Sequence, residues 1–167
     1  AGVLKTRKRL QKVVYLLQTN GCPLNAEYTL HHYGPYSSDV AQLADEMVRA
    51  GLLEEEETPN QARGQSFQYR LSTRARDKLA QLEQQQNNSR PLGQLGSFQT
   101  LAVQLLNEKD LQKLEYAATV VYFQRQGKSW EQARLAAAQF KGEKPDSKVM
   151  SAAESLARGI LGPQEHN

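Results

Sequence analysis

Residues 51–79 read GLLEEEETPNQARGQSFQYRLSTRARDKL, and this stretch predicts two strands followed by a helix. Leu52 to Thr58 is an extended segment, and residues 59–64 form a polar turn. From Ser66 to Leu71 apolar and polar side chains alternate, as expected of a strand with one buried face. Two strands around a glycine-containing polar loop predict a β-hairpin, and the Ser–Thr pair at 72–73 can cap the helix that follows.

The chain before this hairpin predicts two helices around a short strand. A stripe of apolar residues at helical spacing places the first helix at about Leu4 to Thr19. Residues 28–36 predict one strand that Gly34 and Pro35 end, and a second helix covers about 38–50. Its expected buried face is Val40, Leu43, Ala44, Met47 and Val48. The resulting order is helix, strand, helix, hairpin, helix.

The second half of the chain carries helix signals only. Residues 84–97 are rich in amides and then in Pro, Gly and Ser, which predicts a linker. It would join a mixed domain at 1–83 to a helical domain at 98–162, with residues 163–167 as a tail. Asp110 opens one helix of this domain, and Ser129 with Gln132 forms a capping box for another. The fold class expected is therefore α+β and mainly helical.

Composition excludes several classes of protein. The chain has 167 residues, of which 39% are hydrophobic, and 21 basic and 18 acidic residues give a net charge of only +3. No apolar run approaches the roughly 18 residues that span a bilayer, and no leader-like segment precedes the first basic residues. The single cysteine, Cys22, forms no internal disulfide, so a reducing, cytoplasmic setting is the simplest interpretation.

Candidate catalytic and metal sites are weak, and we predict no enzyme, cofactor or metal. His31 and His32 are adjacent, so on a strand they would point to opposite faces. Cys22 with either histidine is a weak candidate for a nucleophilic dyad. The acidic run at 54–57 is better explained as a solvated strand edge than as a carboxylate site.

Binding is the more promising class of function. Six basic side chains of the first helix, the hairpin turn and the hairpin exit are predicted to contact nucleic-acid phosphates: Lys8, Arg9, Lys12, Arg63, Arg70 and Arg74. Three of five outward residues on the helix at 38–50 are acidic, which argues against ordinary reading of the major groove by that helix. Tyr33 and Tyr36 around a Gly–Pro turn either stack a base, hold a partner peptide or fix the corner between strand and helix.

Two motifs resemble the bacterial YwgA-like family over roughly residues 6–80. Arg9, Leu10, Gln11, Lys12 and Tyr15 match its first motif, with Arg9 in place of a lysine, and residues 33–37, Tyr-Gly-Pro-Tyr-Ser, match its second. A more distant resemblance is to the Panacea domain of SocA-like antitoxins. The end of the hairpin also resembles that of winged-helix domains.

These resemblances imply a winged-helix-like N-terminal domain. They favour a DNA-binding or regulatory, antitoxin-like factor as the leading hypothesis. The alternative is a protein–protein interaction module with the same fold and no nucleic-acid contact. The acidic second helix and the nearly neutral charge favour the alternative.

Overall fold

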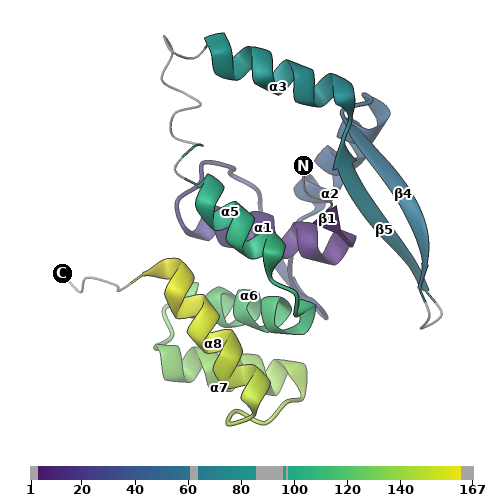
Figure 1. The fold of residues 1–167 in the computed structure, drawn as a ribbon. Coiled ribbons are helices and arrows are strands. Elements are labelled where there is room, and N and C mark those ends of the chain that lie inside the picture. Colours follow the sequence, from purple (N-terminus) through teal and green to yellow (C-terminus); the bar gives the residue numbers. More distant parts are fainter. Residues whose placement is uncertain (1–3, 61–63, 86–95, 97, 163–167) are drawn as a thin grey trace.

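The computed structural model describes residues 4–60, 64–85, 96 and 98–162, and it confirms an α+β, mainly helical chain (Figure 1). The first half contains β1 (Leu4–Lys5), α1 (Arg7–Thr19), β2 (Thr29–His31), β3 (Gly34–Tyr36), α2 (Ser38–Arg49), β4 (Leu53–Asn60), β5 (Gly64–Leu71) and α3 (Thr73–Gln85). The second half contains α5 (Gln99–Asn107), α6 (Leu111–Arg125), α7 (Trp130–Lys141) and α8 (Lys148–Leu161).

The predicted hairpin is confirmed, and it gains a third strand. β4 and β5 pair in an antiparallel register that begins with Leu53 opposite Leu71. β1 joins the other edge of β5, with Leu4 opposite Tyr69. The prediction that Leu4 starts the first helix is therefore wrong. The helix begins only at Arg7, because the backbone of residues 4–6 bonds to β5 and the Thr6 hydroxyl caps the first turn.

Residues 28–36 form a hairpin, not the single strand that the sequence predicts. β2 and β3 are antiparallel, with Leu30 opposite Pro35, so Gly34 and Pro35 lie inside the second strand. Gly34 has a φ of 94°, and a Cβ atom there would lie 2.7 Å from the Thr119 hydroxyl oxygen of α6. Only glycine combines this backbone conformation with so close an approach.

The prediction of a helix at about 38–50 is confirmed by α2. The Ser37 side chain accepts a hydrogen bond from the Val40 amide at its start, and Val40 and Ala44 are buried. Leu43, which the sequence places on the buried face, is instead 57% exposed. α2 packs on α1 and β4 along one side only, so the predicted apolar stripe is wider than the surface that covers it.

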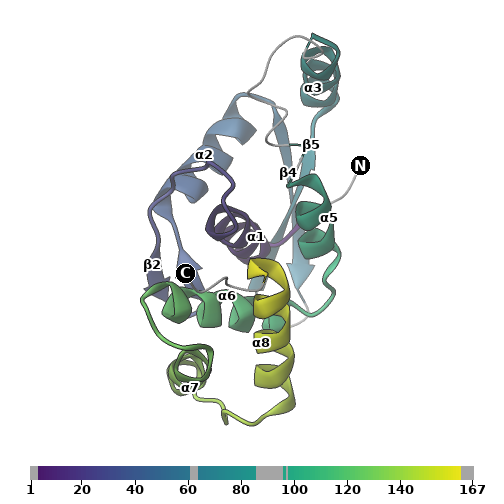
Figure 2. The ribbon, with the colours of Figure 1, turned by 90° about the vertical axis from the view of Figure 1, so that its left-hand side faces the viewer.

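Helix α6 is the centre of the second half. Every residue from Leu114 to Val121 is buried, because α1 covers one side of this helix while α7 and α8 cover the other (Figure 2). The predicted start of this helix at Asp110 is confirmed, and so is the capping box of Ser129 and Gln132. Fully buried alanines let α7 and α8 pack closely on α6: Ala133, Ala137, Ala138, Ala153 and Ala157.

One hydrophobic cluster extends across the predicted division of the chain. Leu16 of α1 packs in the same core as Leu105 of α5, Leu114 of α6 and Met150 of α8. Of the predicted linker, residues 86–95 and 97 lie outside the described residues, so the division into two domains stays a prediction. Within the described ranges, no helix has the length and apolar character needed to cross a bilayer.

Candidate binding surfaces

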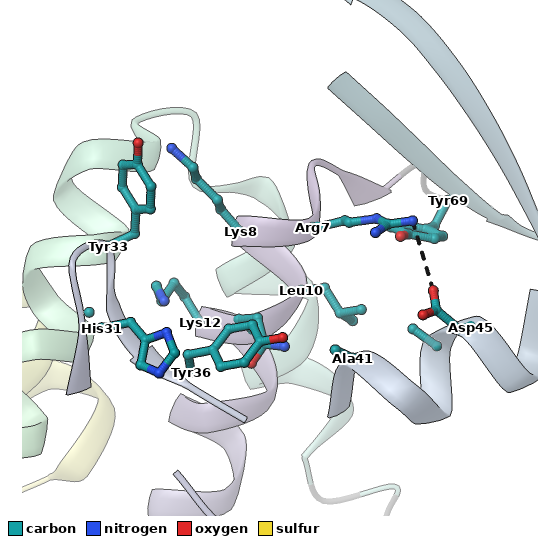
Figure 3. A pocket seen from close by; sticks show the side chains of 13 residues that line it. Arg7, Lys8, Leu10, Lys12, His31, Tyr33, Tyr36, Ala41, Asp45 and Tyr69 are labelled. Carbon is teal, nitrogen blue, oxygen red and sulfur yellow. Dashed lines mark ion pairs between the residues drawn. The ribbon is translucent and has the colours of Figure 1, made fainter. Parts of the chain in front are cut away.

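A cleft at the start of α1 brings together residues that the sequence assigned to different roles (Figure 3). Lys8 and Lys12 share one face of α1 because they are four residues apart. Tyr33 and Tyr36 approach the same space from the β2–β3 hairpin. We call this hollow of about 290 Å³ the basic cleft. Its other lining residues are Arg7, Leu10, Gln11, His31, Gly34, Ala41, Ala44, Asp45 and Tyr69.

Polar side chains of α1 attach the hairpin to the cleft. The side-chain amide of Gln11 donates to the Ser37 carbonyl and accepts from the Ser37 amide, both over 2.9 Å. The Lys12 ammonium donates to the Pro35 carbonyl over 2.6 Å. The two motifs noticed in the sequence, Leu-Gln-Lys and Tyr-Gly-Pro-Tyr-Ser, are thus the two sides of one contact.

Lys12 is a buried cation, with only 2% of its surface exposed. Burial lowers the pKa of Lys12 to about 8, against an opposing effect of Glu115, and the positive charges of Lys141 and Lys8 lower it further. The group is therefore still mainly charged at pH 7. Burial raises the pKa of Glu115, which the surrounding cations, Lys141 foremost, partly counteract.

Aromatic rings form one wall of the basic cleft. The Lys8 ammonium lies 3.2 Å from the centroid of the Tyr33 ring, which is 47% exposed. His31 stacks on Tyr36 at 4.7 Å between centroids, with 20° between the ring planes. These contacts orient Tyr36 along the cleft and leave the Tyr33 ring accessible to solvent.

Arg7, the cation on the opposite side of the cleft, already has acidic partners. The Arg7 guanidinium pairs with Glu55 at 3.0 Å and with Asp45 at 3.8 Å. It also lies over the Phe67 ring, 4.3 Å from the centroid. Lys8 and Lys12, by contrast, have no ion pair within the described ranges.

The six predicted phosphate contacts do not form one exposed stripe. Arg9 is buried and its guanidinium donates to the Glu108 carbonyl oxygen, and Lys12 is buried in the lining of the basic cleft. Both cations donate to backbone carbonyls and are buried, so they do not belong to an exposed stripe, and their contact with nucleic acid stays a prediction. Arg70 pairs with Glu56 at 3.2 Å, and Arg74 is exposed on α3. Arg63 lies outside the described residues.

The weak catalytic candidates gain no support. His31 lies in β2 and His32 in the turn after it, where its ring contacts Tyr33. Cys22 is buried after α1, and burial raises the pKa of its thiol, which disfavours the nucleophilic thiolate. Across the part of the chain that the structure describes, no three His, Cys, Asp or Glu side chains gather as metal ligands would.

A second hollow, which the sequence did not predict, lies beside α2. This α2 groove has a volume of about 390 Å³ and a mostly apolar lining. Leu24 and Leu43 on its border are 42% and 57% exposed. The lining residues are Leu10, Val14, Leu24, Asn25, Ala26, Asp39, Val40, Leu43, Ala44, Met47 and Leu53. The signal in the sequence was a helix whose apolar stripe is broader than one neighbour can cover.

Comparison with known proteins gives one informative similarity. No protein-family model matches the chain. The chain is 35% identical over 72 residues to the uncharacterised protein YwgA of Bacillus subtilis (strain 168). The aligned residues are 43% of this chain and 42% of the relative, so the chain spans less than half of that relative's length. This supports the resemblance to YwgA-like proteins drawn from the motifs.

Proposed function

We propose that this protein is a non-enzymatic regulatory protein, comparable in role to an antitoxin, that binds a protein partner through the α2 groove. One observation carries the proposal: Leu43 is 57% exposed beside an apolar hollow, on a helix that is otherwise well formed. Contiguous exposed apolar surface on a soluble domain commonly marks an interaction site. The order helix, hairpin, helix and two-stranded wing supports a winged-helix-like scaffold for this surface.

The charges around the groove indicate the chemistry of the partner. Asp39 and Glu46 lie four residues before and three residues after Leu43, so both flank it on the surface of α2. The partner that fits is an amphipathic helix with a large apolar anchor between lysine or arginine residues. Such a helix buries its apolar face in the groove while its basic residues meet these carboxylates.

DNA binding is the second candidate, and α3 is the element that favours it. Arg74, Arg76 and Lys78 are all exposed on this helix, at the end of the molecule far from α7 and α8 (Figure 1). Three cations in five residues suit contact with a phosphate backbone. The acidic solvent face of α2 and the inward cations Arg9 and Lys12 weigh against it.

Affinity purification with matched variants tests the two candidates. The partner-binding proposal expects a stoichiometric protein to be recovered with the wild type after nuclease treatment. Leu43→Asp should abolish that recovery, whereas Leu135→Asp, at a residue of α7 that is 46% exposed, should leave it unchanged. Glu46→Gln should make the complex weaker and less sensitive to salt.

The outcomes separate the candidates. Recovery that is lost on nuclease treatment, and reduced by Arg74→Ala but not by Leu43→Asp, would support DNA binding. Equal recovery of a protein partner by the Leu43→Asp and Leu135→Asp variants would overturn the assignment of the α2 groove.

A further inference from the structure

We propose that the basic cleft binds a small phosphate monoester that carries a flat ring, with the size and chemistry of a nucleoside monophosphate. This site is separate from the α2 groove and does not depend on the function proposed for it. The inference rests on the unpaired cations, on the aromatic wall and on the volume of the cleft.

The charge of the cleft matches a phosphate dianion. Three cations and one carboxylate line it, and Arg7 already pairs with Asp45 and Glu55. Beyond the lining, Glu115 and Lys141 act on Lys12 with opposite signs and so offset each other. Lys8 and Lys12 remain as two ammonium groups without an ion pair within the described ranges. A phosphate monoester carries about −1.5 to −2 charges near pH 7, so it balances both of them, whereas a single carboxylate balances one.

Lys12 also has hydrogen-bonding capacity left over. An ammonium group has three donors, and the Pro35 carbonyl takes one of them. No second acceptor for this group is found in the described part of the chain, although Lys12 is 2% exposed and lines the cleft. A phosphate oxygen in the cleft supplies the missing acceptor, in the low-dielectric position where a charged hydrogen bond is strongest.

The aromatic side chains of the cleft are the reason to expect a ligand that carries a flat ring. The Lys8 ammonium covers one face of the Tyr33 ring, which is 47% exposed, and Tyr36 is held in place by stacking on His31 (Figure 3). Ring stacking is sequence-tolerant and contributes to the binding of single bases. The volume of about 290 Å³ lies just below the usual range for ligand pockets, roughly 300–1,000 Å³, and so fits a small ligand. A mononucleotide suits that volume, and a duplex backbone does not reach a buried ammonium.

Calorimetric titration of the full chain with three probes tests the proposal. The probes are adenosine monophosphate, adenosine and inorganic phosphate. We expect the monophosphate to bind at least tenfold more tightly than either of the others, because it alone uses both the cations and the rings. Amide NMR signals of Lys8, His31 and Tyr36 should shift during this titration.

Two variants at accessible positions avoid the risk of unfolding that a change at Lys12 would carry. Lys8→Gln removes a charged hydrogen bond and should weaken binding of the monophosphate about tenfold. Lys148→Gln, at an exposed lysine of α8, is the control and should change nothing. Tyr33→Leu should lower the affinity for the monophosphate several-fold and leave that for inorganic phosphate unchanged.

Three results would overturn the proposal. The first is absence of saturable binding of the monophosphate up to roughly 10 mM, which corresponds to less than about 3 kcal/mol of binding free energy. The second is equal affinity for the monophosphate and for inorganic phosphate. The third is equal binding by the Lys8→Gln and Lys148→Gln variants.

Discussion

The ammonium group of Lys12 in α1 donates a hydrogen bond of 2.6 Å to the carbonyl oxygen of Pro35 in β3. One residue earlier, the Gln11 amide exchanges two hydrogen bonds of 2.9 Å with the backbone of Ser37. All four residues are buried. Because buried polar groups are costly when unpaired, these contacts fix the β2–β3 hairpin and the start of α2 against α1. The shape of the basic cleft therefore depends on polar contacts in the core.

The Gln11→Leu variant should be strongly destabilised. It leaves the Ser37 amide buried without an acceptor, whereas the Ser37 carbonyl keeps the hydrogen bond from the Ala41 amide. One unpaired buried group costs about 1–3 kcal/mol, so we expect a loss of that size in the free energy of unfolding. Urea denaturation measures this quantity. Gln104→Leu, at an exposed residue of α5, is the control and should change stability by less than about 0.5 kcal/mol. Similar stabilities for the two variants would contradict the role of Gln11.

The contribution of Lys12 to the free energy of unfolding should change with pH in the alkaline range. Burial lowers the pKa of Lys12 from its ordinary value of 10.5 to about 8. Between pH 8 and 10.5 the Lys12 amine is mainly protonated in the unfolded chain and mainly neutral in the folded chain. The free energy of unfolding therefore rises with pH in this range, because the folded protein no longer buries a charge. The rise is at most about 1.4 kcal/mol per pH unit.

Comparison of the wild type with Lys12→Met isolates this effect from other titrations. Urea denaturation at about pH 7.5 and 9.5 should show that wild-type stability increases relative to that of the variant. If the difference between the two proteins is the same at both pH values, the lysine is not the buried cation described above.

Gly34→Ala should also be destabilising. The residue has a φ of 94°, and the new Cβ would lie 2.7 Å from the Thr119 hydroxyl oxygen and 3.3 Å from the Glu115 carbonyl oxygen. Backbone strain and overpacking together predict a loss of about 2–5 kcal/mol. Thr119→Ala in the same chain should recover part of that loss, because it removes the closest atom but not the strain.

A helical glycine is the matched control for Gly34. Gly159 in α8 has open space around its Cβ position and no positive φ. Gly159→Ala should therefore stabilise the protein by about 0.5–1 kcal/mol in the same thermal or urea measurement. Destabilisation by both substitutions to a similar degree would show that the close contact with Thr119 is not the cause at Gly34.

The sequence predicts those elements whose signals are local. Local signals predict the capping box of Ser129 and Gln132, the cap at Asp110 and the strand from Ser66 to Leu71, and all three are confirmed. The resemblance to YwgA-like proteins also depends on short motifs, and the 35% identity supports it.

Features that depend on long-range packing were missed. Arg9 and Lys12 look like surface cations in the sequence, but Glu108 and Pro35, distant in the chain, supply carbonyl acceptors that allow them to be buried. Leu4 joins β1 because β5 offers an open edge. The basic cleft combines α1, the β2–β3 hairpin, α2 and β5, so the sequence indicates its residues without indicating that they meet.

The ion pair between Arg7 and Glu55 should make the free energy of unfolding change with pH in the acidic range. Burial alone would raise the pKa of Glu55, but hydrogen bonds from Tyr69 and Arg7 hold it below its ordinary value of 4.5. A carboxyl with a depressed pKa stabilises the fold above its unfolded pKa, and this contribution is lost as the pH falls through the folded value.

Because the Arg7 side chain is 52% exposed, solvent screening limits the contribution of the pair to about 1 kcal/mol or less. Unfolding free energies between about pH 3 and 6.5 should show that Glu55→Gln is less stable than the wild type at pH 6.5 and that the difference shrinks toward pH 3. Glu57→Gln is the control, since Glu57 is exposed and has no ion pair within the described ranges. A difference between wild type and Glu55→Gln that is constant across this range would show that the pair does not couple protonation to folding.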